Sequence, residues 1–236
     1  MLQQRCVVFA GRRGLDQAGL RQSVARIPEV SRKLKLAQIL IDKVQEAKGH
    51  IDLFSALNAS EGEFASKQSL RALMAAIVQL GLYERYARFY GQATFLVGNT
   101  NGVSAISTIS GTHSFEEMVE NSSFYKELIE SKDLPEQQQM MGQALTLTGL
   151  SLEEFGVYSN QEGNFEKQDW GTQDSYQIMS QLYQDHQVEQ FVHVGPHHEF
   201  RVQEMSKRKI YEFSLWNSVE LDPILNSFWK TVTSVG

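Results

Sequence analysis

The feature that most constrains the fold is the pentapeptide Gly98-Asn99-Thr100-Asn101-Gly102, which has glycines on both sides of a central hydroxyl residue. This spacing matches the G-x-S-x-G nucleophile elbow, in which a strand turns sharply into a helix and holds the central side chain above the sheet. Residues 92–97, which precede the motif, are largely apolar and β-prone, as the strand requires. Residues 103–110, on the helix side, are rich in serine and threonine and fit less well.

Threonine at the centre of the motif leaves two interpretations open. The central residue of an elbow usually has a positive φ, where a β-branched side chain is strained. Either Thr100 carries that strain because its hydroxyl does chemistry, or the turn has relaxed and the hydroxyl no longer reacts. The rest of the chain has to decide between these.

Composition narrows the class of protein. A chain of 236 residues that is 42% hydrophobic can bury one core, or one core and a small appendage. The net charge of −6 argues against a general nucleic-acid binder. Cys6 is the only cysteine, which excludes internal disulfides, favours a reducing compartment and predicts a buried structural thiol. No secretory leader and no long apolar run are visible, so we expect a cytoplasmic protein without a membrane span.

β-prone runs alternate with helical periodicity along the chain. Strands are expected at 6–10, 92–97, 155–159, 191–194 and 210–216. Helices are expected at 27–48, 66–88, 114–130, 140–147 and 175–185 and from Pro223 onward, with a polar loop at 160–171. This alternation predicts an α/β fold in which an open, mostly parallel sheet is flanked by helices, within a single domain over 1–236.

Five short motifs follow one another in an order that characterises one family. Val7-Val8-Phe9-Ala10-Gly11 is similar to the opening strand F-V-F-P-G-Q-G, and Asp52-Leu53-Phe54 with 68–76 is similar to D-L-W…Q-P-A-L-L-x-A. The elbow is similar to G-H-S-L-G, Ser110-Gly111 with 115–119 to A-G…F-x-D-A-V, and 189–196 to E-x-x-x-E-V-G-P. The chain thus resembles the malonyl-CoA:acyl carrier protein transacylases. The resemblance implies an acyltransferase large-subdomain with an α/β-hydrolase-like core.

The departures from this family concern its chemistry. Thr100 stands where the family has its nucleophilic serine, and Asn99 where it has the preceding histidine. Arg12 replaces the glutamine whose backbone helps to form the oxyanion hole, so Arg12 and Asn101 occupy the oxyanion-loop positions. The malonyl-binding arginine of the family falls near Tyr125, and no arginine occurs between Arg88 and Arg201.

Two further parts of the family pattern are missing. The catalytic histidine is expected before the strand at 155–159, but no histidine occurs between His113 and His186. The connection at 126–154 is too short for the ferredoxin-like subdomain that walls the acyl pocket in the family. The adjacent pair His197 and His198 is the remaining candidate base, and otherwise a solvated loop pair. It lacks a third ligand for a metal, so we expect neither a metal nor a cofactor.

These losses favour a non-catalytic acyltransferase-like protein that binds an acyl carrier protein or another subunit of a fatty-acid or polyketide synthase. The alternative is an active acyltransferase or thioester hydrolase with Thr100 as nucleophile. Basic stretches could dock the acidic carrier protein or be merely solvated: Arg21, Arg26, Arg32, Lys33 and Lys35, and Arg201, Lys207, Arg208 and Lys209. Surface exposed by the missing subdomain could instead pair with a copy of this chain or with another subunit. His193, within an apolar strand, is interpreted as a partnered core or edge histidine.

Overall fold

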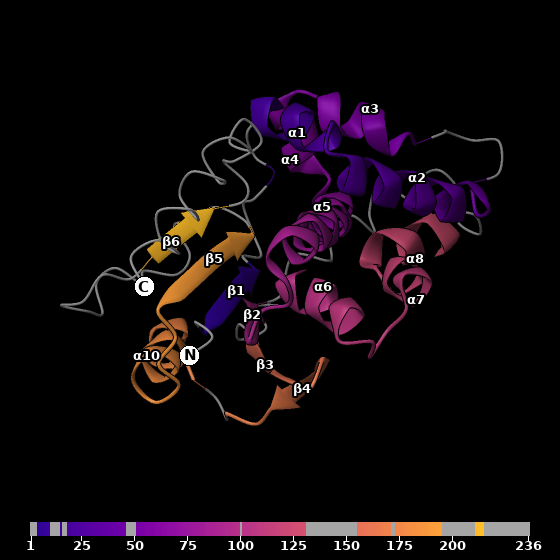
Figure 1. The fold of residues 1–236 in the computed structure, drawn as a ribbon. Helices are drawn as coiled ribbons and strands as arrows, with labels where there is room; N and C mark the ends of the chain where they lie inside the picture. Colours follow the sequence, from indigo (N-terminus) through magenta and orange to yellow (C-terminus); the bar gives the residue numbers. More distant parts are fainter. Residues whose placement is uncertain are drawn as a thin grey trace.

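A mixed β-sheet flanked by helices forms the centre of the molecule (Figure 1). The computed structural model describes residues 4–9, 15, 18–45, 51–99, 101–130, 155–170, 173–194 and 211–214. The strand order is β4-β3-β2-β1-β5-β6. The strands are β1 (Arg5–Phe9), β2 (Phe95–Asn99), β3 (Phe155–Gln161), β4 (Asn164–Gln168), β5 (Gln190–Val194) and β6 (Tyr211–Ser214). The predicted α/β class is therefore confirmed.

Strand direction changes across the sheet. β1 pairs in parallel with β2 and with β5, and β5 pairs in parallel with β6. β3 lies antiparallel to β2, and β4 antiparallel to β3. The described sheet is thus mixed, with an antiparallel hairpin at one edge.

That hairpin corrects the prediction of a loop at 160–171, because β3 runs on to Gln161 and β4 follows from Asn164. Glu162 and Gly163, with φ of 53° and 96°, form the two-residue turn that a twisted hairpin needs. Asn160 Oδ1 accepts a hydrogen bond from the Gly163 N–H at 2.8 Å. The segment is polar because most of β4 is exposed at the sheet edge.

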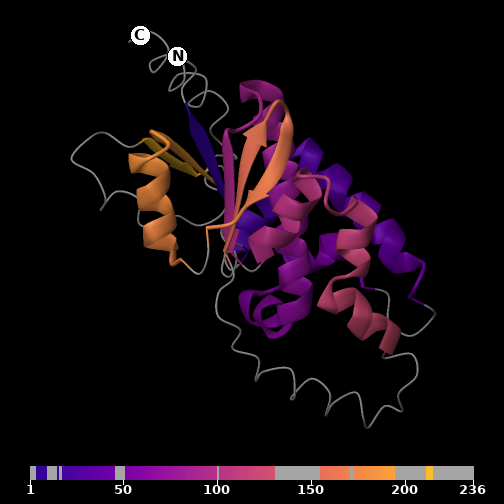
Figure 2. The same cartoon turned by 90° about the horizontal axis from the view of Figure 1, so that it is seen from below.

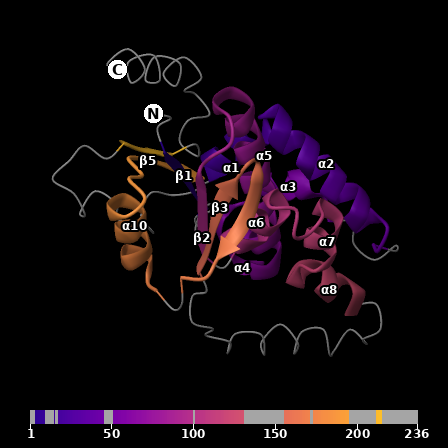
Figure 3. The same cartoon turned by 60° about the horizontal axis from the view of Figure 1, so that its bottom comes forward.

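Helices lie on both faces of the sheet. They are α1 (Ala18–Ala25), α2 (Pro28–Asp42), α3 (Leu53–Asn58), α4 (Glu61–Ser66), α5 (Gln68–Tyr90), α6 (Asn101–Ile109), α7 (Phe115–Glu120), α8 (Ser123–Glu130) and α10 (Ser175–Gln184). Figures 2 and 3 show α10 on one side of the sheet and α1 to α8 on the other. None of the described helices is long and apolar enough to cross a lipid bilayer.

The helix boundaries test the periodicity argument. The helices expected at 66–88 and 175–185 are confirmed within one or two residues. The helix expected at 114–130 is two helices, because Ser122 Oγ accepts a hydrogen bond from the Tyr125 N–H and donates one to the Val119 carbonyl. The helix expected at 27–48 ends at Asp42. Those expected at 140–147 and from Pro223 lie outside the described residues.

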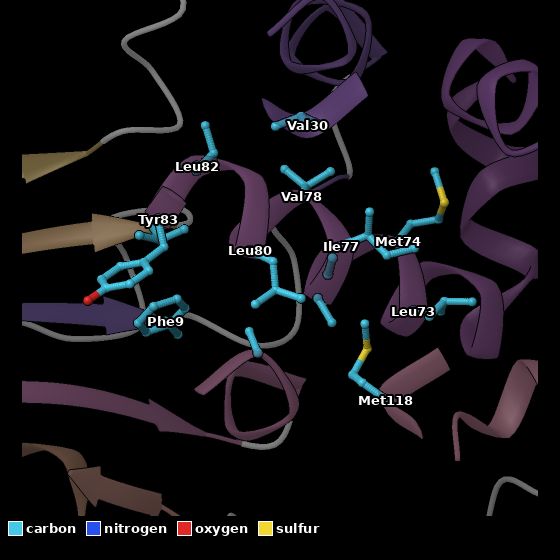
Figure 4. Packing of buried hydrophobic residues seen from close by; sticks show 14 of the residues in the cluster. Phe9, Val30, Leu73, Met74, Ile77, Val78, Leu80, Leu82, Tyr83 and Met118 are labelled. Carbon is cyan, nitrogen blue, oxygen red and sulfur yellow. The ribbon is translucent and has the colours of Figure 1, made fainter. Parts of the chain in front are cut away.

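The larger core lies between the sheet and α2, α5 and α6. Figure 4 shows α5 side chains such as Ile77, Leu80 and Tyr83 directed into it, with Tyr83 beside Phe9 of β1. Gly81 lets α2 approach α5 closely, since a Cβ there would lie 2.6 Å from the Val30 Cα. Because its side chains are buried from Leu70 to Tyr86 over much of its length, α5 is the central helix of the fold.

The smaller core lies between the sheet and α10 and contains Val8, Val97, Leu182 and Cys6. Cys6 is fully buried, as predicted, and burial raises the pKa of its thiol. A buried, protonated thiol is unreactive, so Cys6 acts as a small apolar residue.

The position of Arg21 corrects the prediction that this residue belongs to a basic docking stretch or a solvated face. Its side chain is fully buried, and its guanidinium donates to the carbonyls of Leu57 (3.1 Å), Leu15 (2.7 Å) and Ala59 (2.5 Å). The group also stacks over the Phe64 ring. Arg21 therefore ties α1 to the chain around α3 and contributes nothing to a docking surface.

Candidate functional site

The candidate site lies at the junction of β2 and α6. β2 ends at Asn99 and α6 begins at Asn101, so a single residue, Thr100, separates strand from helix. The strand and helix that the elbow motif predicts are thus both present, although 103–109 is rich in serine and threonine. Thr100 and the Asn101 side chain lie outside the described part of the chain.

Packing explains both glycines of the motif. A Cβ on Gly98 would lie 2.8 Å from Ile106 Cδ1 and 3.0 Å from the Gly102 carbonyl carbon. A Cβ on Gly102 would lie 2.3 Å from the Phe9 carbonyl oxygen and 2.9 Å from the Phe9 Cβ. The first turn of α6 is therefore pressed against β2 and against the end of β1. Only residues without a side chain permit this approach.

Asn99 is the last residue of β2, and its polar side chain lies next to the turn. It is 4% exposed and pairs with Phe155 in the antiparallel register between β2 and β3. In the part of the chain that the structure describes, its Oδ1 atom has no hydrogen-bond partner. A buried amide oxygen that accepts no hydrogen bond costs about 1–3 kcal/mol. A carboxamide cannot take up a proton at neutral pH, so Asn99 can offer hydrogen bonds but cannot act as a base.

The elbow stands at the usual ligand edge of a parallel sheet. β1, β2 and β5 run in the same direction, so Phe9, Asn99 and Val194 end at one edge. β2 and β5 lie on opposite sides of β1, so the carboxyl end of β1, next to the elbow, is at a topological switch point of the sheet. Arg12, His197 and His198 follow these strands in sequence but lie outside the described residues.

A neutral groove begins in the first turn of α6 and continues between α5, α7 and α8. Its volume is about 330 Å³. Polar side chains line much of it, namely Ser69, Ser104, Ser107, His113, Asn121, Ser122 and Ser123. Its apolar lining is Ala72, Leu73, Ala76, Val103 and Met118. No lysine, arginine or carboxylate is among these lining residues, so the groove suits a neutral ligand better than an anion.

The groove was missed in the sequence, although a signal was present. Ser104, Ser107 and Thr108 recur at three- and four-residue spacing, which places them on one face of α6. Ser104 and Ser107 line the groove. Serine has a modest helix propensity, but in α6 the serines lie on the polar side of a helix.

Tyr125 occupies the position near which the family resemblance places a malonyl-binding arginine. It lies on α8, is 9% exposed and packs in the larger core. A buried aromatic ring thus takes this place, and it offers no charge to a carboxylate.

The described histidines are spread over the fold. His193 is fully buried in β5, which confirms the prediction of a core histidine. His186 stacks on Trp170 and lies against Phe95, at the opposite end of β2 from the elbow. His113 is exposed after α6, where its backbone N–H donates to the Ser107 carbonyl. Within the described ranges, no three His, Cys, Asp or Glu side chains are grouped as a metal site requires.

Comparison with known proteins finds no matching family model, no matching curated protein and no matching solved structure. The resemblance to the transacylases therefore rests on the order and spacing of the motifs alone.

Proposed function

We propose that the chain is a non-catalytic acyltransferase-like protein that binds an acyl carrier protein or another subunit of a fatty-acid or polyketide synthase. The observation that carries the proposal is the contrast within the elbow. Its steric frame is intact, because Gly98 and Gly102 still allow α6 to press on β1 and β2. Its chemistry is altered, because Asn99 and Thr100 stand where the family has histidine and serine.

The fold arrangement supports the same proposal. β2, β1, β5 and β6 run in parallel, as in a mostly parallel, hydrolase-like large subdomain. The β3–β4 hairpin follows the short connection at 126–154, where the family inserts its ferredoxin-like subdomain. We accordingly propose an acyltransferase large-subdomain core that lacks the smaller subdomain.

The chemistry of the site supports binding rather than catalysis. Acyl transfer needs a nucleophile, a base beside it and donors for the oxyanion. A threonine hydroxyl is not ionised at neutral pH, and the neighbouring Asn99 carboxamide cannot deprotonate it. Tyr125 and the residues that line the groove offer no lysine or arginine to a malonyl carboxylate, whereas the groove's apolar lining suits a neutral acyl chain. A single cysteine suits a reducing compartment, and we propose that the protein acts in the cytoplasm.

The second candidate function is acyl transfer or thioester hydrolysis with Thr100 as nucleophile. One observation favours it: Thr100 is the only residue between β2 and α6, which is where an elbow holds its nucleophile. This function requires a base from the chain outside the described residues, and His197 and His198 are the candidates.

Intact-mass measurement distinguishes the two functions. The full chain is incubated with malonyl-CoA and with acetyl-CoA, beside Thr100→Ala and the control Thr112→Ala on the exposed α6–α7 turn. We expect no acyl adduct on any of the three proteins, and we expect the wild-type chain to bind purified holo acyl carrier protein. An adduct on the wild type and on Thr112→Ala that is absent from Thr100→Ala would overturn the non-catalytic proposal.

A further inference from the structure

An exposed phenylalanine at the C-terminal end of α5 lies against two arginines. Phe89 is 60% exposed. The Cζ atoms of Arg85 and Arg88 lie 5.6 Å and 5.2 Å from the centroid of its ring. Single exposed apolar side chains are common on protein surfaces, but this ring is part of an ordered aromatic–guanidinium cluster.

The two arginines share one buried carboxylate. Arg85 Nη1 lies 3.5 Å from Glu29 Oε2, and Arg88 pairs with Glu29 Oε1. Glu29 is 3% exposed, whereas the Arg88 side chain is 60% exposed. The negative charge is therefore buried between α2 and α5, while a positive charge and an aromatic ring face the solvent.

Positive charge continues along the crossing of α2 and α5. Arg32 pairs with Glu84, and Lys33 Nζ lies 3.7 Å from the same carboxylate. The Arg32 side chain is 59% exposed. Together with the two arginines of α5, four cations pair with two carboxylates among the described residues, although the chain as a whole carries a net charge of −6.

We propose that the surface formed by Phe89, Arg85, Arg88 and Arg32 docks an acidic segment of a partner protein, with an apolar side chain of the partner covering Phe89. Aromatic residues and arginines are enriched in interfaces and carry much of their binding energy. A local positive surplus on an acidic protein steers an acidic partner to that surface. This inference rests on the proposed function, since it gives the acidic acyl carrier protein its place on the fold.

The position of this surface separates docking from the elbow. α5 ends at Tyr90 and β2 begins at Phe95, so Phe89 lies toward the amino edge of β2, whereas the elbow is at the carboxyl edge. A partner docked at Phe89 is held without any need to deliver a group to Thr100. A scaffold can hold its partner at such a distance from the elbow, whereas a transferase must bring the acyl group to its nucleophile.

Fluorescence anisotropy with labelled holo acyl carrier protein tests the surface on the full chain. The variants are Phe89→Ala and the matched control Tyr176→Ala, whose ring is 54% exposed on α10 across the sheet. We expect the dissociation constant to rise at least about tenfold for Phe89→Ala, as for an interface hot spot, and to stay within about twofold for Tyr176→Ala. Wild-type binding should weaken as salt is raised from about 0.05 to 0.2 M.

The outcomes separate the two proposals. Equal binding by the wild type and both variants overturns the docking surface and leaves the proposed function standing. Absence of binding by the wild type overturns the carrier-protein form of the proposed function, and the occupant of the surface with it. Concentration-dependent self-association that Phe89→Ala abolishes, measured by light scattering, identifies a second copy of this chain as the occupant and also overturns the docking proposal.

Discussion

Gly102→Ala tests whether the elbow is built by close packing of α6 on the sheet. The added methyl group would lie 2.3 Å from the carbonyl oxygen of Phe9 and 3.0 Å from its carbonyl carbon. Neither atom can move aside easily, because β1 is paired with β2 on one side and with β5 on the other. Accommodation requires α6 to lift away from the end of β1.

The magnitude follows from two opposing effects. Overpacking a close contact costs about 1–3 kcal/mol, and a contact with fixed backbone lies at the upper end of that range. Replacing a helical glycine by alanine returns up to about 1 kcal/mol of helix propensity. We expect a net loss of about 2 kcal/mol in the free energy of unfolding. For a chain of this size, that lowers the melting temperature by about 4–8 °C.

The assay is urea unfolding followed by circular dichroism, with Gly62→Ala as the matched control. Gly62 lies within α4, and a Cβ there would meet no atom within 4 Å. The same substitution should therefore raise the stability by up to about 1 kcal/mol. If Gly102→Ala is as stable as Gly62→Ala, α6 is not pressed against β1, and the steric account of the elbow is wrong.

Two further variants, a single and a double substitution, test the buried polar groups. Arg21→Met should lower the free energy of unfolding by about 3 kcal/mol, since it leaves three carbonyl oxygens without a donor at about 1 kcal/mol each; urea midpoints within error of the wild type would refute this. Burial raises the pKa of the Cys6 thiol, and it raises the pKa of Tyr86 to about 12. Because the native state holds both protons more tightly than the unfolded chain, stability is full below about pH 9 and falls as the pH rises further. Cys6→Ala combined with Tyr86→Phe should reduce this alkaline loss, and an unchanged pH profile of the urea midpoint would contradict it.

Local sequence was a good guide to the helices and strands that carry strong periodicity. α5 was predictable because apolar side chains recur at helical spacing through its length. The β2–α6 turn was predictable because Gly98 and Gly102 flank the three residues 99–101, which follow a β-prone run. The β3–β4 hairpin was not, because its polar side chains resemble those of a loop until a neighbouring strand pairs with them.

The candidate site, too, was predictable from the sequence only in part. The identity of Asn99 and Thr100 shows which chemical groups flank the elbow, and no structure is needed to see that a carboxamide is not a base. The groove depends on how α5, α6, α7 and α8 come together. It was therefore invisible in a chain read segment by segment.

The sequence by itself determined the strand–turn–helix order around Thr100, the central helix and the chemical departures from the acyltransferase pattern, because these depend on backbone preferences and side-chain identity over a few residues. Only the tertiary structure decided where charge is buried and where it is exposed. Arg21 and Arg32 belong to one basic stretch in the sequence, yet Arg21 is enclosed by carbonyls as far away as Ala59, while Arg32 lies exposed near the crossing of α2 and α5. Burial depends on contacts between residues distant in the chain, so it follows from the packed fold rather than from any local pattern.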